Sequence, residues 1–239
     1  YNFTGKELSY YLQNIKNDKS DSGYENNIFG AGVGLSYERF KDIYFSPGIS
    51  LTHDDLRTDS SASTLLKNQS GTSTDLMFDY SFATDKRDRR FMPTDGYLTS
   101  FFQELPIYAN QPHIKNSFSS SHYKEVSEDV IGAVKFGLTA INGLNDEDVR
   151  VSKRLGLSSK RLRGFEPGKI GPKDGNDFIG GNYSSSFNVE ANFPNFFPEK
   201  SNADIGLFFD AGNVWGVDYS DTLDDSNKIR STVGTNLSW

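Results

Sequence analysis

A chain of 239 residues with 35% hydrophobic content and a mean hydropathy of -0.58 has no run of about 18 apolar residues, which excludes a helical membrane protein. The lack of cysteine excludes disulfides, thiolate metal sites and cysteine nucleophiles. A net charge of -7 argues against a general nucleic-acid binder, whose surface is basic. An aromatic share of 14% with 22 glycines favours β structure. Low mean hydropathy is compatible with a membrane β-barrel, because every second strand residue faces the lumen.

The start of the chain, YNFTGKEL, has no charged segment followed by an apolar core, so the chain begins without a signal peptide. We therefore expect that a targeting segment has been removed or that the chain is a piece of a longer protein. We treat residues 1–239 as one domain.

Alternation of apolar and polar residues is the main signal for strands along the chain. In 28–40, apolar side chains recur from Phe29 to Tyr37 with glycine, serine or glutamate between them. The short link 39–42 predicts a tight hairpin. By this criterion we expect about ten strands and no helix of consequence. The predicted strands are 7–16, 28–40, 43–53, 74–84, 97–105, 114–125, 130–141, 183–193, 204–212 and 229–239.

Two of these segments, 97–105 and 114–125, alternate only weakly and are predicted mainly from their spacing. In 74–84 the polar side carries Asp75 and Asp79, which suggests a wet interior.

The links between predicted strands alternate in length. Long polar links fall at one end of the sheet, namely 17–27, 54–73, 142–181 and 216–227. Shorter links fall at the other end, namely 39–42, 86–96, 126–129 and 194–202, and 106–113 breaks the trend. Strands of ten or more residues with this loop asymmetry predict an all-β fold, an antiparallel transmembrane β-barrel. A soluble β-sandwich also alternates, but its strands average nearer five or six residues.

The longest link carries a basic and glycine-rich segment, RLRGFEPGKIGPKDGNDFIGG, at 161–181. A basic run is usually a solvated surface loop, but these glycines and prolines suggest defined tight turns. Alternation places Glu190 and Asp210 on the lumen-facing side of the following strands. An arginine carried into a barrel needs a carboxylate partner. We expect this loop to turn into the lumen.

Several motifs resemble those of one family. They are RLRGF, IGP, GGN, FNVEANFP, LFFDAGNVW and NKIRSTVGTNLSW, with DYSFATDKRDRRFMPTDGY upstream. Together, in this order and over essentially the whole chain, they are similar to the barrel of the BamA family, the outer-membrane protein insertases of the bacterial surface antigen superfamily. The resemblance implies a partial barrel, strands five to fourteen of sixteen, with a long extracellular loop, about 142–181, folded into the lumen.

The resemblance also assigns site residues. Arg163, Gly164 and Phe165 match the arginine-glycine-phenylalanine motif of the in-folded loop, and Glu190 and Asp210 match the acidic residues of the two strands that follow. Arg163 is expected to pair with Asp210, Glu190 or both, as a lumenal latch with a structural and conformational role. Leu162 replaces the usual valine or isoleucine. In the family, the barrel opens at a seam between its first and last strands, and neither of these strands is in the chain. The SPxGPL segment is missing as well.

By the same resemblance, the chain is part of a machine that folds and inserts β-barrel proteins into the outer membrane of a Gram-negative-type envelope. Implied partners are unfolded β-barrel proteins, outer-membrane lipids, accessory assembly lipoproteins and periplasmic POTRA modules, with no nucleic acid and no cofactor. A two-partner-type secretion pore and the translocation-module relative share the loop motif and remain alternatives. A passive diffusion porin is a further alternative, in which the latch motif is unexpected.

An enzyme would need a constellation of catalytic residues, and the sequence offers none. His53, His113 and His122 are read as lone surface histidines. The glycines of GAGVG at 30–34 lie inside a strand, which argues against a dinucleotide site. Acidic residues such as Asp54 and the cluster at 218–225 have no calcium-loop spacing and are read as solvated loops. We expect neither catalysis nor a metal site.

Overall fold

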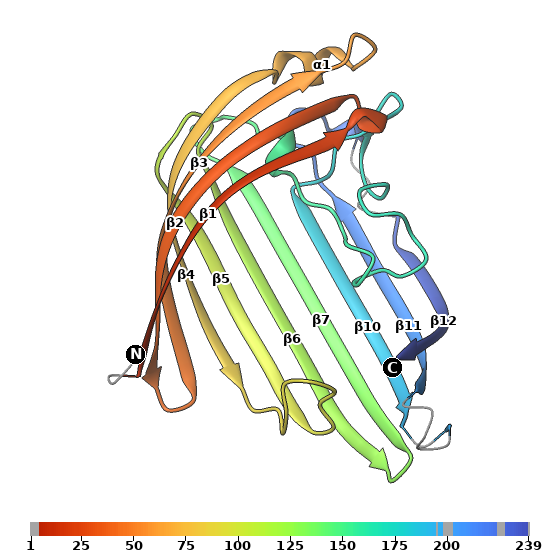
Figure 1. Ribbon diagram of the computed structural model, residues 1–239. Coiled ribbons are helices and arrows are strands. Elements are labelled where there is room, and N and C mark those ends of the chain that lie inside the picture. The colour runs from red at the N-terminus through yellow and green to blue at the C-terminus, as the bar shows by residue number, and fades with distance from the viewer. Residues whose placement is uncertain (1–4, 195, 198–202, 224–227, 239) are drawn as a thin grey trace.

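The computed structural model describes residues 5–194, 196–197, 203–223 and 228–238. Ten antiparallel strands form one sheet in chain order (Figure 1). Their bounds are β1 (Lys6–Lys19), β2 (Tyr24–Phe40), β3 (Ile43–Thr58), β4 (Gly71–Asp85), β5 (Gly96–Ala109), β6 (His113–Ser127), β7 (Val130–Gly143), β10 (Tyr183–Phe193), β11 (Asp204–Trp215) and β12 (Arg230–Ser238). The predicted ten-stranded, all-β fold is confirmed. Part of the predicted link 194–202 and the predicted strand end at Trp239 lie outside the described residues.

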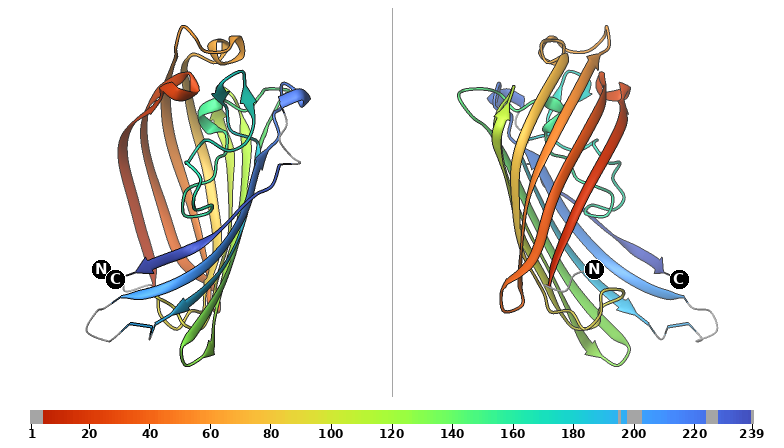
Figure 2. Two further views of the ribbon diagram at one scale, coloured as in Figure 1. Left: turned by 90° about the vertical axis from the view of Figure 1, so that its right-hand side faces the viewer. Right: turned by 60° about the vertical axis from the view of Figure 1, so that its left-hand side comes forward.

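The sheet curves into a trough and is not closed, because the strand order runs linearly from β1 to β12 (Figure 2). In the described part of the chain, helical structure is limited to α1 (Thr64–Asn68) and to short 3-10 turns. Within the described residues no helix has the length and apolar character needed to cross a membrane. The open, ten-stranded antiparallel sheet confirms the partial-barrel prediction in its architecture.

The predicted hairpin between β2 and β3 is tight. Its turn consists of Lys41 and Asp42, and Asp42 adopts a positive φ of 62°, a conformation that aspartate tolerates better than most residues. The backbone N–H of Asp42 donates a 2.6 Å hydrogen bond to Glu38 Oε1, which stabilises the turn.

Strands extend further than the hydrophobic pattern predicted. The expected loop 17–27 is mostly strand, because β1 continues to Lys19 and pairs with Tyr24 at the start of β2. The link expected at 106–113 shrinks to 110–112, and β3 continues to Thr58. In β1 and β3 the reason is that the backbone ladder continues into mostly polar residues, where alternation vanishes. In β5 a bulge at Ile107, where Tyr108 pairs with Leu76 and Pro106 with Met77, interrupts the alternation.

The two faces of the sheet differ in character. Large apolar side chains are exposed on the convex face, among them Phe29 (48% exposed), Phe187 (42%) and Phe209 (44%). The concave face carries polar and charged side chains that the long loop covers, such as Asn188 (1%) and Asp210 (0%). This distribution is what a lipid-facing exterior and a polar lumen require.

The weak alternation of β5 and β6 has a structural cause. Gln103 and Asn116 face the convex side with Phe118, because the register pairs Gln103 with Asn116 and Phe101 with Phe118. Gln103 Nε2 donates to Asn116 Oδ1 at 2.5 Å, and the hydroxyl of Tyr80 donates to Gln103 Oε1 at 2.7 Å. Polar side chains thus interrupt the apolar face, and they form hydrogen bonds with one another.

One predicted surface histidine is not on the surface. His113 begins β6, is 3% exposed, and its Nε2 lies 3.2 Å from Glu104 Oε1. The sequence interpretation was wrong there because Gln111 and Pro112 suggested a loop, whereas the strand begins one residue later.

Candidate functional site

The long link between β7 and β10, residues 144–182, folds against the concave face of the sheet (Figure 2). Within it, β8 (Lys173–Asp174) and β9 (Asp177–Phe178) form a short hairpin. The tight turns expected from its glycines are present. Gly171, for example, has a φ of +101°, and a Cβ there would lie 2.8 Å from Val214 Cγ1 of β11. Glycine at this position therefore lets the loop backbone approach the sheet wall.

Arg163 binds Asp210 through three hydrogen bonds. Its Nε donates to Asp210 Oδ2 at 2.7 Å and its Nη2 to Oδ1 at 2.6 Å. Its backbone N–H donates to Oδ2 at 3.0 Å. Asp210 is 0% exposed and receives a planar, two-point guanidinium contact, the geometry for which arginine is best suited.

Glu190 is the second carboxylate at this arginine. Its Oε1 lies 2.9 Å from Arg163 Nη2. Its other oxygen, Oε2, accepts a 2.7 Å hydrogen bond from Lys135 Nζ of β7. Two carboxylates thus face two cations, so the charges at this site balance. Lys135 was not singled out from the sequence, although the alternation of β7 already placed it opposite the apolar residues.

Asn188 and Phe208 complete the surroundings of Arg163, and sequence reasoning missed both. Asn188 Nδ2 donates to Asp210 Oδ1 at 2.7 Å and to the carbonyl of Arg161 at 2.8 Å. The Arg163 guanidinium carbon lies 3.7 Å from the ring centroid of Phe208, a cation-π contact. Both residues share the inward parity of Glu190 and Asp210, and that parity was the available signal.

The other motif residues have separate tasks. Gly164 adopts a φ of +82°, and a Cβ there would lie 3.3 Å from Thr232 Oγ1 of β12. Phe165 packs on a buried apolar cluster that anchors the loop on β11. The cluster consists of Leu157, Leu162, Ile170 and Val214. The Leu162 departure keeps an apolar side chain at a position that is 1% exposed.

The electrostatics favour a permanently charged latch. The hydrogen bond to Asp210 raises the pKa of Arg163, outweighing the effect of its burial. An arginine already protonated at every physiological pH offers no acid-base chemistry. The arrangement therefore holds the loop in position against β10 and β11.

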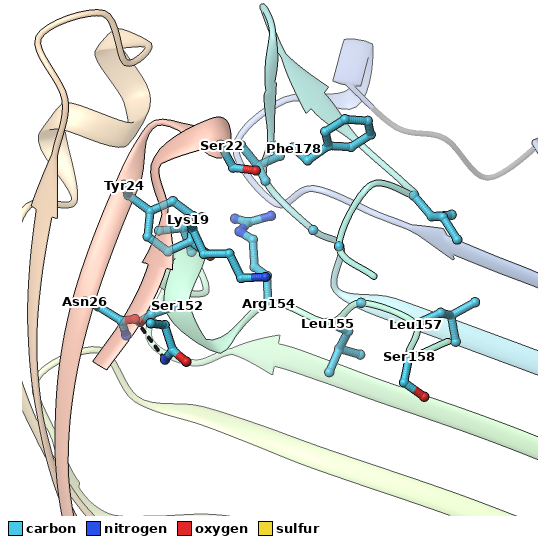
Figure 3. A pocket seen from close by; sticks show the side chains of 17 residues that line it. Lys19, Ser22, Tyr24, Asn26, Ser152, Arg154, Leu155, Leu157, Ser158 and Phe178 are labelled. Atoms are coloured by element: carbon cyan, nitrogen blue, oxygen red, sulfur yellow. Dashed lines mark hydrogen bonds between the residues drawn. The ribbon is translucent and has the colours of Figure 1, made fainter. Parts of the chain in front are cut away.

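A cavity of about 350 Å³ lies between the loop and the β1–β2 hairpin (Figure 3). The hairpin contributes Lys19, Tyr24 and Asn26, and the loop contributes Arg154 and Leu155 among others. Among all residues that the structure describes, no three His, Cys, Asp or Glu side chains lie close enough together to hold a metal ion.

Comparison with known proteins places this architecture in a family. The model of the Omp85 superfamily domain matches residues 2–239. A SAM50-like protein of Schizosaccharomyces pombe is 30% identical over 140 residues, which is 56% of this chain and 30% of the relative. The crystal structure of BamA from Haemophilus ducreyi lacking POTRA domains 1–3 superposes with a TM-score of 0.85 at 21% identity, over 99% of this chain and 54% of that one.

The chain thus spans about a third of the curated relative and about half of the solved BamA chain. The structural match concerns the fold, whereas the family match covers nearly the whole sequence. The curved antiparallel sheet of this chain is therefore the fold that it shares with the BamA barrel. This chain belongs to the Omp85 superfamily and is part of an outer-membrane β-barrel related to those of BamA and SAM50-like proteins.

Proposed function

We propose that this chain is the central part of an insertase barrel that folds and inserts β-barrel proteins into the outer membrane of a Gram-negative-type envelope. The observation that carries the proposal is the charge-balanced contact of Arg163 with Asp210 and Glu190 inside an Omp85 barrel. It holds the in-folded loop as a latch against the strands that lead towards the end of the chain.

The energetics support a latch that matters to function. Arg163 is a loop residue, and without Asp210 its guanidinium and backbone N–H would lose three hydrogen bonds. Breaking a buried ion pair by removing one partner costs about 3–5 kcal/mol. A loop tied to the wall with this strength keeps one shape in the lumen while the rest of the barrel works on a substrate.

The proposed partners follow from this role. They are unfolded outer-membrane β-barrel proteins, outer-membrane lipids, and the accessory assembly lipoproteins and POTRA modules of a full-length chain. We propose no enzymatic activity and no cofactor.

The test uses the full-length protein reconstituted in lipid vesicles. Arg163→Ala is compared with Arg163→Lys and with the control Arg57→Ala, because Arg57 is a surface residue whose side chain is 71% exposed. We expect Arg163→Ala to slow assembly of an added barrel substrate by roughly tenfold, if about 1.4 kcal/mol of the latch energy is needed in the working state. The assembly rate of Arg163→Lys should lie between those of Arg163→Ala and the wild type. The rate of Arg57→Ala should equal that of the wild type.

Barrel integrity is followed separately, by the shift in gel mobility between unheated and heated samples. A folded Arg163→Ala barrel that assembles substrate at the wild-type rate would contradict the latch role. A wild-type protein that exports one soluble partner and assembles no barrels would favour the two-partner-type secretion pore instead.

A further inference from the structure

The in-folded loop has a second attachment, on the opposite side of the trough, that the sequence did not predict. Arg150 Nε lies 3.2 Å from Asp54 Oδ2 of β3, and these side chains are 6% and 1% exposed. Ser152 Oγ donates to the same Oδ2 at 2.5 Å, and Asn26 Nδ2 of β2 donates to Oδ1 at 2.8 Å. Asp54 is therefore a buried acceptor with several donors, and its interpretation as a solvated loop residue was wrong.

Further contacts widen this attachment, which we name the stem anchor after its position at the start of the loop. Lys153 Nζ lies 3.0 Å from Asp75 Oδ2 of β4, and Asp75 is 3% exposed at its side chain. The backbone N–H of Val151 donates to Gln69 Oε1 at 2.6 Å. The side chain of Val151 joins a buried apolar cluster with Leu56 and others. The stem anchor thus joins the loop to β3, β4 and the α1 region, and Asn26 of β2 supports it through Asp54.

The two attachments lie on different walls. The stem anchor holds the loop to β3 and β4, whereas Arg163 holds it to β10 and β11, four strands further along the sheet from β4. Beyond Ser152 the chain is attached again at Arg154, which pairs with Asp218, and at Leu155, which exchanges two backbone hydrogen bonds with Gly181 just before β10. Residues between Val151 and Ser158 line the cavity beside the β1–β2 hairpin (Figure 3).

We propose that residues 150–163 form a strap between the two walls, in which Arg150 and Asp54 are positioning residues that hold Arg163 within reach of its carboxylates. The inference rests on the proposed function only in one respect: it takes the Arg163 contact to be the latch and names the residues that keep that latch in place. Physically, the stem anchor raises the effective concentration of Arg163 at Asp210, as any tether does for a second contact on the same chain.

A strap makes the two attachments interdependent. Distant sites without shared partners normally contribute additively to stability. If the stem anchor holds the latch segment in place, however, its loss also weakens the latch. Removing the latch afterwards then has a smaller effect, because part of its contribution has already gone.

The experiment is a double-mutant cycle on the full-length protein with Asp54→Asn and Arg163→Lys. Asp55→Asn is the matched control, because Asp55 is the sequence neighbour on the opposite face and pairs with the exposed Arg57. The measured quantity is the midpoint temperature at which the heat-sensitive gel mobility is lost. We expect Asp54→Asn to lower it by roughly 5–10 °C, Asp55→Asn to leave it unchanged, and the double variant to lower it by less than the sum of the singles.

A second readout follows the latch directly. Limited trypsin digestion with mass spectrometry measures cleavage after Lys160, Arg161 and Arg163. We expect the cleavage rate in Asp54→Asn to rise several-fold although the substitution lies on the other wall. If Asp54→Asn does not fold, Ser152→Ala replaces it, because it removes one hydrogen bond to Asp54 and leaves the ion pair.

Additive midpoint shifts together with unchanged cleavage at 160–163 would show two independent contacts and overturn the strap. An Asp54→Asn variant that behaves like Asp55→Asn would overturn it as well. Neither readout involves substrate assembly, so a failure here leaves the proposed function standing. Equally, a strap that passes both tests in a barrel without insertase activity would contradict only the proposed function.

Discussion

The concave and convex faces of this sheet obey opposite rules, although they are formed by alternate residues of the same strands. On the concave face, the charged side chains Asp210 and Glu190 are buried beneath the loop and are paired with specific cations. On the convex face, large apolar side chains such as Phe136 and Leu138 are 38% and 42% exposed. The stability of the concave face comes from directional pairing of charged groups. The convex face is stable in lipid only where it exposes no unpaired polar groups.

This difference predicts how substitutions behave. On the concave face a change of charge leaves a specific partner unpaired, so the cost depends on which atoms lose a bond. Among the apolar side chains of the convex face a new charge finds no partner, and the cost depends on the hydration of the new group and its depth in the membrane.

The largest effect is expected on the concave face, at Asp210→Ala. It removes all three hydrogen bonds that Arg163 makes with this carboxylate and leaves Asn188 with one acceptor fewer. We expect a loss of about 3–5 kcal/mol in the free energy of unfolding, measured by urea titration of the barrel in detergent micelles. Glu190→Ala should cost less, since Asp210 would still bind Arg163 through two side-chain contacts. Equal losses for the two variants would mean that Asp210 is not the dominant partner.

A charge introduced on the convex face should lower the free energy of unfolding slightly less than Asp210→Ala does. Phe136→Arg places a guanidinium among apolar side chains in the middle of β7, and the expected loss is about 2–4 kcal/mol in lipid vesicles. Phe136→Leu is the matched control and should stay within about 1.5 kcal/mol of the wild type. If Phe136→Arg were as stable as this control, the convex face would not be in contact with lipid at this position.

The smallest effect is expected at the polar exception on the convex face, the amide pair of Gln103 and Asn116. The double variant Gln103→Leu, Asn116→Leu replaces a hydrogen-bonded amide pair with apolar side chains. Both amides are removed together, and only the hydroxyl of Tyr80 loses its acceptor, so we expect a change within about 1 kcal/mol of the wild type in lipid vesicles. Gln103→Leu alone leaves Asn116 without this donor and should be the less stable of the two. A loss greater than about 2 kcal/mol in the double variant would show that the pair has a further task.

Alternation along the sequence was sufficient for much of the fold. Together with spacing, which was needed for the weakly alternating segments 97–105 and 114–125, it predicted all ten long strands of the sheet and the tight β2–β3 hairpin. It also placed Glu190 and Asp210 on the inward side, where both contact Arg163 in the structure. These features are local, because the period of two in a strand decides which face each residue occupies, whatever the distant chain does.

Other features depended on residues that are far apart in the chain. Asp54 and Arg150 are joined across the trough, and nothing near either residue marks the other as its partner. The continuation of β1 to Lys19 and the outward amides of β5 and β6 also departed from the hydrophobic pattern. The hydrophobic pattern shows only which side chains face an apolar environment. Backbone ladders and polar side chains that bond to one another form without any such pattern. The sequence alone thus determined the strands and their faces, while the path of the long loop was decided by contacts that exist only once both walls are in place.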